Sequence, residues 1–277
     1  YILVQGDTTS VLTGALTAFY NQIPVGHIEA GLRTGDIYSP FPEEANRKLV
    51  GNIADIHFAP TDVNVDNLLR ENYPKEKIIK CGNTVIDALY WVKKNKNKDI
   101  EEIKKKYRVD DKKYILITMH RRENWGKPME ETLRAVRDYL EKHEDIYLVF
   151  PMHLNPLVRD TAHRVLDGFE RKILIEPLEY LEFIAIMDGA HYIMTDSGGV
   201  QEEAPSLGKP TLVLRDTTER PEAIEAGTAK LIGTKYEEVI KDMELLEGET
   251  YEKMSKANNP YGDGKTSERI RKYLETI

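Results

Sequence analysis

Short apolar runs alternate with segments of helical periodicity along most of the chain. Each run is bounded by polar or turn-forming residues, and the segments between runs space their apolar residues as one face of a helix does. This alternation is typical of parallel sheets covered by helices. The expected strands are 1–4, 25–28, 56–59 and 78–81, followed after a gap by 114–118, 146–149, 173–175, 192–195 and 211–214. The pattern therefore predicts an α/β fold with two sheets.

A strongly charged stretch, residues 93–111, separates the two groups of strands. It holds few apolar side chains, so we expect the boundary between two lobes there. Each lobe is predicted to be a doubly wound, Rossmann-like sheet, with a ligand cleft at the carboxyl ends of the strands. The predicted domains are 1–92 and 93–266.

The composition narrows the kinds of partner. The 277 residues carry 39 Lys and Arg against 47 Asp and Glu, a net charge of −8, which disfavours nucleic acid because such surfaces need clustered cations. No apolar run approaches the roughly 20 residues of a membrane span, and the first residues lack the pattern of a signal peptide. Cys81 is the only cysteine, which excludes an internal disulfide and a cysteine-built zinc site, and metal-ligand spacings are absent. We therefore expect a cytoplasmic protein without nucleic-acid, membrane or metal partners.

Acidic residues gather where strands of the first lobe end. Asp7 follows the first strand and Glu29 follows the second, while Glu43 and Glu44 open the next helix. Carboxylates at one edge of a sheet suit proton transfer, because burial and mutual repulsion move at least one pKa towards neutrality. Two simpler interpretations remain open, namely an Asp or Thr of this first loop as a helix cap and Glu44 as a first-turn acid that favours the helix dipole. His27 is more typical of a packed or hydrogen-bonded histidine than of a catalyst.

A basic loop, His120–Gly126, follows the first strand of the second lobe. Arginine offers a fork of donors to a diphosphate, and histidine can bind or protonate a leaving group. A surface cluster of salt bridges is the simpler alternative.

A turn of Ser197, Gly198 and Gly199 joins a later strand to a helix. Backbone N–H groups at such a turn bind anions, and glycine permits close approach. Glu203, further along that helix, would face the same side and could accept two hydrogen bonds from a ribose diol. Arg220 returns positive charge to this site, although its position before the helix start at Pro221 is an alternative reason for its presence.

Together these segments resemble the non-hydrolysing UDP-N-acetylglucosamine 2-epimerases, which have the two-lobed fold called GT-B. The resemblance implies an isomerase that interconverts UDP-N-acetylglucosamine and UDP-N-acetylmannosamine by eliminating UDP, forming a glycal and adding UDP back. It implies no cofactor, a homodimer, and a role in polysaccharide biosynthesis. The matching strings are GDTTS, GHIEAGLRTGD, YSPFPEEANR, GNTVIDAL, HRREN, PMHLNP, TDSGGVQEEAPSLGKP, LRDTTERPEA and NPYGDG.

The resemblance also implies roles for particular residues. The catalytic acids are Asp7, Glu29 and Glu43, and His120 lies at the diphosphate. Positions to examine for allosteric activation by substrate are Glu44, Arg121 and His153. The implied binding positions are Phe183 and the backbone near Leu178 at the uracil, Glu203 at the ribose, Ser197, Gly198 and Gly199 at the phosphates, and Arg220.

The family carries a GTRPE-like loop before its first such strand, and this sequence lacks it, so we expect residues upstream of Tyr1. By the same resemblance, residues 267–277 are expected to cross back to the first lobe. Three alternatives remain: a hydrolysing 2-epimerase, in which water attacks the glycal, a GT-B glycosyltransferase, and an inactive nucleotide-sugar sensor. The strings HRREN and PEEANR favour the non-hydrolysing branch.

Overall fold

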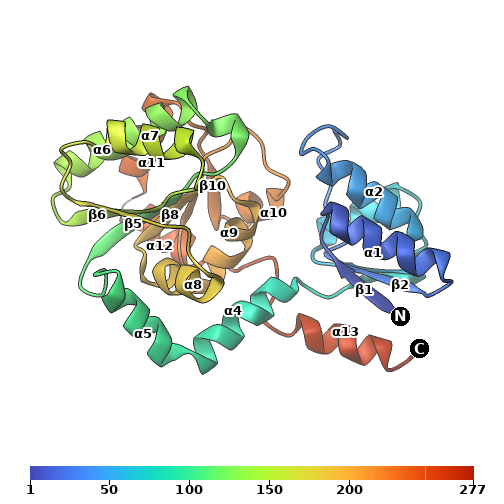
Figure 1. Ribbon diagram of the computed structural model, residues 1–277. Coiled ribbons are helices and arrows are strands. Elements are labelled where there is room, and N and C mark those ends of the chain that lie inside the picture. The colour runs from blue at the N-terminus through green and yellow to red at the C-terminus, as the bar shows by residue number, and fades with distance from the viewer. Residues whose placement is uncertain (247) are drawn as a thin grey trace. The chain divides into compact units, whose positions relative to one another are not determined.

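Every strand expected from the sequence forms, and the strands assemble into two parallel sheets. The structure is a computed structural model that describes residues 1–246 and 248–277. The described chain divides into unit 1, Tyr1–Ala88 with Pro260–Ile277, and unit 2, Leu89–Asn259. Both are parallel sheets covered by helices, so the predicted α/β class is confirmed (Figure 1). The assignment of functions to residues 1–92 and 93–266 stays a prediction.

In unit 1 the strands follow the order β1-β2-β3-β4 across the sheet. These strands are β1 (Ile2–Gln5), β2 (Val25–Ile28), β3 (Ile56–Ala59) and β4 (Ile78–Lys80). The helical elements are α1 (Thr9–Tyr20), α2 (Glu43–Ile53), α3 (Asp62–Arg70), the 3-10 turn η1 (Lys75–Lys77), the first residues of α4 (Thr84–Asn95), and α13 (Thr266–Leu274).

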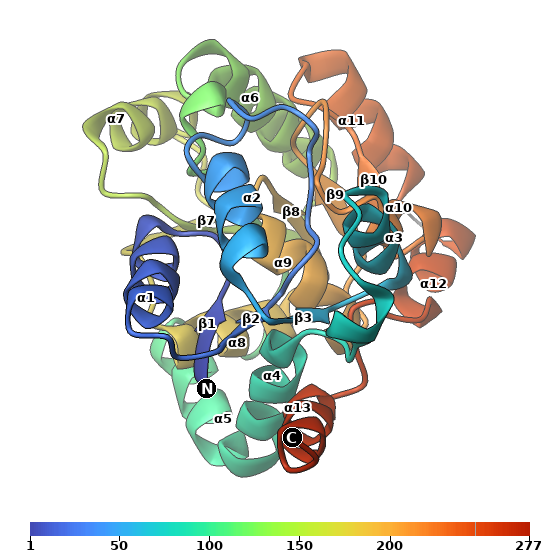
Figure 2. The same ribbon diagram turned by 90° about the vertical axis from the view of Figure 1, so that its right-hand side faces the viewer.

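Three apolar cores hold unit 1 together, one of them beneath α3. Helices α1 and α2 lie side by side in Figure 2 and pack on β1 and β2 through buried residues such as Ala15 and Val50. A second core joins α13 to β3, where the Tyr273 ring meets the Phe58 ring edge-on at 5.9 Å. The Asp87 carboxylate accepts the first free N–H groups of α13, from Thr266 at 3.0 Å and Ser267 at 2.6 Å. This cap ties the C-terminal helix to unit 1.

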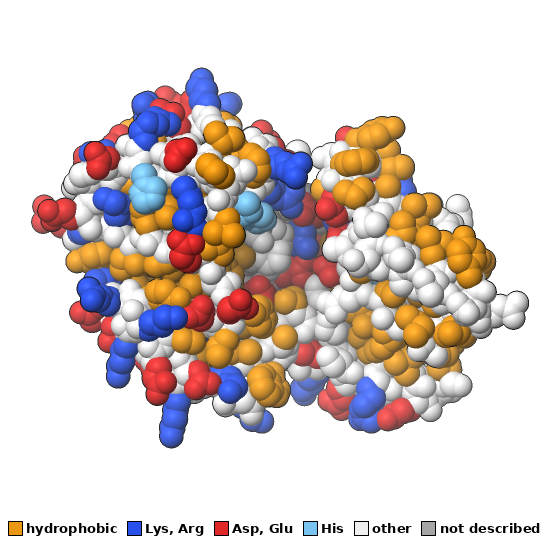
Figure 3. Space-filling view, viewed as in Figure 1, with side chains coloured by type: hydrophobic (Ala, Val, Ile, Leu, Met, Phe, Trp, Pro, Cys, Tyr) orange, Lys and Arg blue, Asp and Glu red, His pale blue; other side chains and the backbone are white. Residues whose placement is uncertain are grey.

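The edge strand of unit 1 carries apolar side chains on an exposed surface. Ile2 and Leu3 on β1 are 40% and 44% exposed, and Phe19 and Tyr20 at the end of α1 are 57% and 77% exposed. Figure 3 shows this unit with apolar side chains spread over its surface.

Unit 2 contains a larger sheet with helices on both of its faces. In Figure 1, α6, α7 and α11 cover one face, and α5 and α8 cover the other. The strands are β5 (Lys113–Thr118), β6 (Ile146–Pro151), β7 (Lys172–Ile175), β8 (Tyr192–Thr195), β9 (Thr211–Val213) and β10 (Ala229–Leu231). The helical elements are α5 (Asn97–Lys106), η2 (Arg122–Asn124), α6 (Lys127–Lys142), α7 (Pro156–Val165), α8 (Tyr180–Gly189), α9 (Gly198–Glu203), η3 (Ala204–Leu207), α10 (Pro221–Glu225), α11 (Tyr236–Leu245) and α12 (Glu249–Lys256).

The strand order in unit 2 is β10-β9-β8-β5-β6-β7, so the direction of winding reverses between β5 and β8. Loops that leave the carboxyl ends of these two strands turn to opposite sides and open a crevice between them. The order therefore places a ligand site at Thr118 and Thr195, the last residues of β5 and β8.

Two features of unit 2 differ from the sequence-based expectations. Strand β10 was not predicted, because it has three residues with Lys230 in the middle and lacks an apolar run. The charged stretch 93–111 folds largely into α5, which buries Ile100 against the core and pairs Lys104 with Asp188 on α8 at 3.0 Å. This stretch thus belongs to unit 2, and the break between the units falls at Ala88.

Candidate nucleotide pocket and acidic cluster

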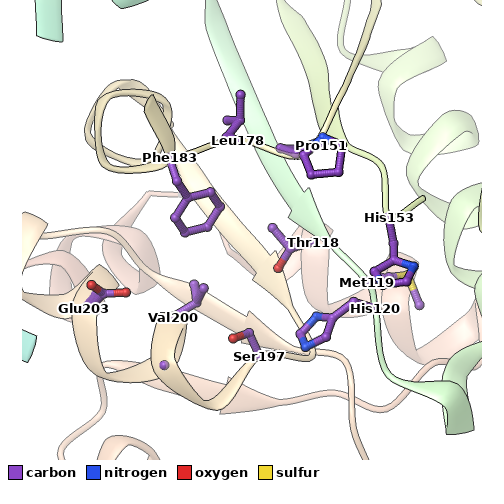
Figure 4. Close-up of a pocket in the computed structure, with 12 residues that line it drawn as sticks. Thr118, Met119, His120, Pro151, His153, Leu178, Phe183, Ser197, Val200 and Glu203 are labelled. Atoms are coloured by element: carbon purple, nitrogen blue, oxygen red, sulfur yellow. The ribbon is translucent and has the colours of Figure 1, made fainter. Parts of the chain in front are cut away.

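A cavity of about 300 Å³ opens at the switch point of the unit 2 sheet. At its base the hydroxyls of Thr118 and Thr195 are hydrogen-bonded at 2.6 Å, which holds the ends of β5 and β8 together. Figure 4 shows Phe183 over Val200 at one end, with His120 and His153 at the other. The lining residues are Thr118, Met119, His120, Pro151, His153, Pro177, Leu178, Phe183, Ser197, Gly199, Val200 and Glu203.

Most of the predicted binding residues of the second lobe therefore meet in one cavity. A mostly apolar wall with a few convergent polar groups is typical of a small-molecule site. Three of the predicted residues do not line it, and they lie behind its wall or beside it: Gly198, Arg121 and Arg220.

His120 is held by a buried carboxylate that the sequence analysis did not single out. Asp196 is fully buried and its Oδ1 lies 2.9 Å from Nδ1 of His120. Because a carboxylate can only accept, Nδ1 carries the hydrogen and Nε2 is left for other contacts. Asp196 Oδ2 also accepts from the backbone N–H of His120 and Arg121 and from Nδ2 of Asn124, each at 3.0 Å. One side chain thus fixes both the His120 ring and the loop that carries it.

The pKa of Asp196 reflects these contacts. Burial alone would raise it, but the hydrogen bonds from His120, the Arg121 N–H and Asn124 hold the pKa of Asp196 below its usual value. The carboxylate is therefore charged at neutral pH, as its acceptor role requires.

The turn of Ser197, Gly198 and Gly199 has the glycine requirement that the sequence indicates. A Cβ at Gly198 would stand 2.3 Å from Nη1 of Arg220, whereas one at Gly199 would meet nothing within 4 Å. The Ser197 N–H already donates to Oγ1 of Thr195 at 2.9 Å. The N–H groups of Gly198 and Gly199 lie in the first turn of α9, where no preceding helical carbonyl can accept them.

The two glycines should respond differently to alanine. Gly198→Ala forces a methyl group against the buried Arg220 guanidinium, so we expect the free energy of unfolding to fall by about 1–3 kcal/mol. Gly199→Ala adds a methyl group in open space, and the free energy should stay within about 0.5 kcal/mol of the wild type. Urea denaturation followed by circular dichroism measures both. Equal stability of the two variants would contradict the close approach at Gly198.

Arg220 belongs to a buried charge cluster around Glu219. Its Nη1 lies 2.6 Å from Glu219, and its Nε lies 2.5 Å from Glu202. Arg215 and Arg121 reach the same Glu219 carboxylate at 2.5 and 3.2 Å. Burial raises the pKa of Glu219, but the three guanidinium groups outweigh it and lower this pKa to about 2. These contacts support the Gly198 turn from behind, and a binding role for Arg220 stays a prediction.

Glu203 forms the polar part of the cavity wall beside Phe183. Only 6% of it is exposed, and its Oε1 accepts a hydrogen bond from the Tyr180 hydroxyl at 2.8 Å. Burial, with a smaller contribution from the neighbouring Glu202, raises the pKa of Glu203 to about 7 although the Tyr180 bond opposes the shift. A carboxyl group poised near neutrality in a cavity is a recognised sign of a functional site.

In unit 1, Asp7 is oriented by residues of α2. Arg47 donates to Asp7 Oδ2 from both Nε, at 3.0 Å, and Nη2, at 2.7 Å. Asn46 holds the Asp7 backbone carbonyl at 2.9 Å. Arg47 is itself fixed by the fully buried Glu44, 2.9 Å away, which also accepts from the Thr34 N–H. Because both Arg47 bonds use one oxygen, Asp7 Oδ1 is left for other contacts.

Glu29 approaches the same turn. Its Oε2 would lie 3.6 Å from a Cβ on Gly6, and its backbone has φ of +68°. Such a left-handed conformation costs a non-glycine residue about 1 kcal/mol or more, and strain of this kind concentrates at functional sites. Glu43 is the first residue of α2 and is half-buried. The structure thus joins Asp7 and Glu29 at one turn and sets Glu43 on the helix that orients Asp7.

His27 is a structural residue, as the sequence favours. It is 1% exposed, and its Nε2 donates to the Gly6 carbonyl at 2.8 Å. Burial lowers the pKa of His27 to about 4, so the ring is neutral at physiological pH. It fixes the backbone just before Asp7, and the packed interpretation is confirmed.

Among the described residues, no helix is both long and apolar enough to span a bilayer. Nor do three His, Cys, Asp or Glu side chains gather there in a way that could hold a metal ion.

Two parallel α/β units, one with a cavity at its switch point, define the GT-B class of fold, and solved structures of that class match the chain closely. The UDP-GlcNAc 2-epimerase from Neisseria meningitidis bound to UDP-GlcNAc matches with a TM-score of 0.92 at 47% identity, covering 99% of this chain and 76% of that one. The S. aureus MnaA-UDP co-structure matches with a TM-score of 0.91 at 50% identity, again over 99% and 76% of the two chains.

Sequence comparisons agree with the fold. The family model described as UDP-N-acetylglucosamine 2-epimerase matches residues 1–275. The UDP-N-acetylglucosamine 2-epimerase of Escherichia coli K12 is 53% identical over 99% of this chain and 75% of its own length. The chain belongs to the UDP-N-acetylglucosamine 2-epimerase family. Epimerases are isomerases, so the 2-epimerase family and the isomerase class are confirmed, and the non-hydrolysing branch stays a prediction.

Proposed function

We propose that this protein interconverts UDP-N-acetylglucosamine and UDP-N-acetylmannosamine without releasing the free sugar. The observation that carries the proposal is the switch-point cavity, in which His120, Phe183 and Glu203 line one space. A relative of 47% identity has a structure described as bound to UDP-GlcNAc, which supports the same ligand for this chain.

Unit 2 is proposed to bind UDP. The Phe183 ring and the backbone near Leu178 form an apolar slot that suits a uracil base. Glu203 lies beside it, where a carboxylate can hold the ribose hydroxyls. The diphosphate would then reach the Gly199 end of the turn and the Nε2 side of His120. Arg220 would contribute by supporting Gly198 from behind.

Unit 1 is proposed to supply the acids that act on the sugar: Asp7, Glu29 and Glu43. One carboxylate accepts the proton from carbon 2 while the bond between carbon 1 and the UDP oxygen breaks, which yields a glycal and UDP. A carboxylic acid then returns a proton to the opposite face of carbon 2, and UDP re-forms the bond to carbon 1. Protons and electron pairs balance, so the reaction needs no redox cofactor.

Three positions are proposed for regulation by substrate: Glu44, Arg121 and His153. His153 lines the cavity with Nδ1 accepting from the Asn155 N–H at 3.1 Å. Arg121 is bonded to Glu219, and Glu44 is buried against Arg47. Because its own carboxylate is enclosed, Glu44 would act through the groups that it binds, which are Arg47 and the backbone at Thr34.

We also propose that the protein is a cytoplasmic homodimer that supplies polysaccharide biosynthesis. The buried, free thiol of Cys81 is compatible with a reducing compartment. The other two features rest on the family resemblance.

Heavy water provides the test of the reaction. We expect the protein, incubated with UDP-N-acetylglucosamine in deuterium oxide, to place deuterium at carbon 2 of UDP-N-acetylmannosamine that stays linked to UDP. The reason is that the acid which protonates the opposite face of carbon 2 has exchanged its own proton with the solvent. NMR of the recovered nucleotide sugars, without added metal or nicotinamide, measures the label.

Each other outcome points to a different function. Free labelled N-acetylmannosamine would indicate a hydrolysing 2-epimerase, in which water attacks the glycal. Unchanged substrate would indicate a glycosyltransferase or an inactive sensor and would end the proposal. Epimer without label would require internal return of the proton or a transient oxidation.

A further inference from the structure

Tyr180 is the one neighbour of Glu203 that donates a hydrogen bond to it among the contacts of the described residues. Tyr180 opens α8, and Glu203 ends α9 in the wall of the cavity, so the bond joins two helices. Tyr180 is 43% exposed, whereas Glu203 is almost fully buried. Tyr180 does not line the cavity itself, so it holds Glu203 from outside the lining.

The hydroxyl constrains the carboxylate in two ways. It occupies Oε1 at 2.8 Å, which fixes the plane of the group and leaves Oε2 for a ligand. It also stays a donor, because burial and the Glu203 charge raise the pKa of Tyr180 above its usual range. A donor that is always protonated favours the charged form of its acceptor.

Other charged groups near Glu203 do not replace this donor. Glu202, next to it on α9, is paired with Arg220 at 2.5 Å and repels a second negative charge. On the far side of the cavity stand His120, bound to Asp196, and His153. Tyr180 is thus the group that opposes the cost of burying the Glu203 charge.

We propose that Tyr180 is a positioning residue of the nucleotide pocket, whose hydroxyl orients the Glu203 carboxylate toward the ribose and favours its charged form. The inference rests on the proposed function, since it assigns the ribose to Glu203. A charged carboxylate accepts a ribose hydroxyl more strongly than a neutral carboxyl group does. Recognition of the ribose should therefore weaken on acidification.

The direction of the pH dependence follows from the pKa of Glu203. With the pKa of Glu203 raised to about 7, the group is mostly charged at pH 8 and mostly neutral at pH 6. UDP also titrates near pH 6 through its terminal phosphate. The ratio of the dissociation constants of 2′-deoxy-UDP and UDP removes that contribution, because both ligands carry the same diphosphate.

Isothermal titration calorimetry of both nucleotides between pH 6 and pH 9 tests the proposal. For the wild type, UDP should be preferred about tenfold at pH 8, the worth of one hydrogen bond to a charged group, and about twofold at pH 6. In Tyr180→Phe the midpoint of this change should move to higher pH, with the preference restored at pH 9. In Glu203→Gln the preference should be lost at every pH.

The matched control is Tyr236→Phe. It removes a hydroxyl that donates a hydrogen bond to Asp138 at 2.7 Å, and neither residue lines the cavity. It should leave the preference and its midpoint unchanged. Two results would overturn the inference even if UDP still binds. One is a pH midpoint in Tyr180→Phe equal to that of the wild type, and the other is a wild-type preference for UDP over 2′-deoxy-UDP that does not change between pH 6 and pH 9. Absence of UDP binding by the wild type at any pH would instead overturn the proposed function, and the inference with it.

Discussion

Neutral amides at the three acids of unit 1 should each lower kcat by about 100-fold or more while UDP affinity stays within about twofold. The variants are Asp7→Asn, Glu29→Gln and Glu43→Gln. The amide keeps the shape of the side chain and removes its ability to exchange a proton. UDP lacks the sugar on which these groups act, so its binding should be unaffected. NMR of the approach to epimer equilibrium gives kcat, and calorimetry gives the affinity.

Asp7 is expected to be the most sensitive of the three. Arg47 binds Oδ2 twice and leaves Oδ1 for chemistry, so an amide either loses the reactive oxygen or turns its NH2 group towards the guanidinium. The matched control is Asp62→Asn, which changes an exposed carboxylate of the same unit that is paired with Lys80, and it should leave kcat unchanged. Turnover like that of the wild type in all three acid variants would remove the acids from the reaction.

The strands were predictable because each is a short apolar run between polar segments, and most of them are buried in the sheet, although β1 is largely exposed. Strand β10 escaped prediction because it lies at an edge of the sheet with Lys230 exposed in its centre. Neighbouring strand β9 supplies its pairing, and a partner of this kind is not visible in the local sequence.

The candidate residues were predictable where they follow the end of a strand. Glu29, His120 and Ser197 all do so, and the carboxyl edge of a parallel sheet is where ligands bind. The residues that hold these side chains in place were not predictable from the sequence. Asp196 meets His120 from 76 positions along the chain, and Arg47 meets Asp7 from 40. Their roles come from contacts across the fold, which a linear pattern does not contain.

Glu44 illustrates the same limit from the other direction. Its place in the first turn of α2 indicated a helix-dipole interaction, and the resemblance suggested regulation. The structure shows a completely buried carboxylate that binds Arg47 and the backbone of the preceding loop. A buried charge of this kind needs several hydrogen-bond partners. The burial of Glu44, from which this need follows, could not be predicted from the sequence.

Removing the Asp196 carboxylate should destabilise unit 2 more than any other single change considered. Asp196→Ala removes the buried acceptor of two backbone N–H groups, of one amide hydrogen of Asn124 and of the half-exposed His120 ring. We expect the free energy of unfolding at pH 7 to fall by about 3–5 kcal/mol, as when one partner of a buried charged network is deleted. Urea denaturation measures the loss. The control is Asp145→Ala, an exposed partner of Lys113, which should change the free energy by about 0.5 kcal/mol or less.

The effect should also depend on pH in a defined direction. Although burial opposes it, hydrogen bonding keeps the pKa of folded Asp196 below its usual value, so the unfolded state binds the proton more readily. The stabilisation from Asp196 is therefore complete above about pH 4, the ordinary aspartate pKa, and is lost as pH falls through the folded value. The difference in free energy of unfolding between the wild type and Asp196→Ala should therefore decrease steadily below about pH 4. Two results would contradict this: a difference in free energy of unfolding that stays constant down to pH 3, or one below about 1 kcal/mol at pH 7. Either would show that the four donors find other acceptors and that Asp196 does not hold His120 in place.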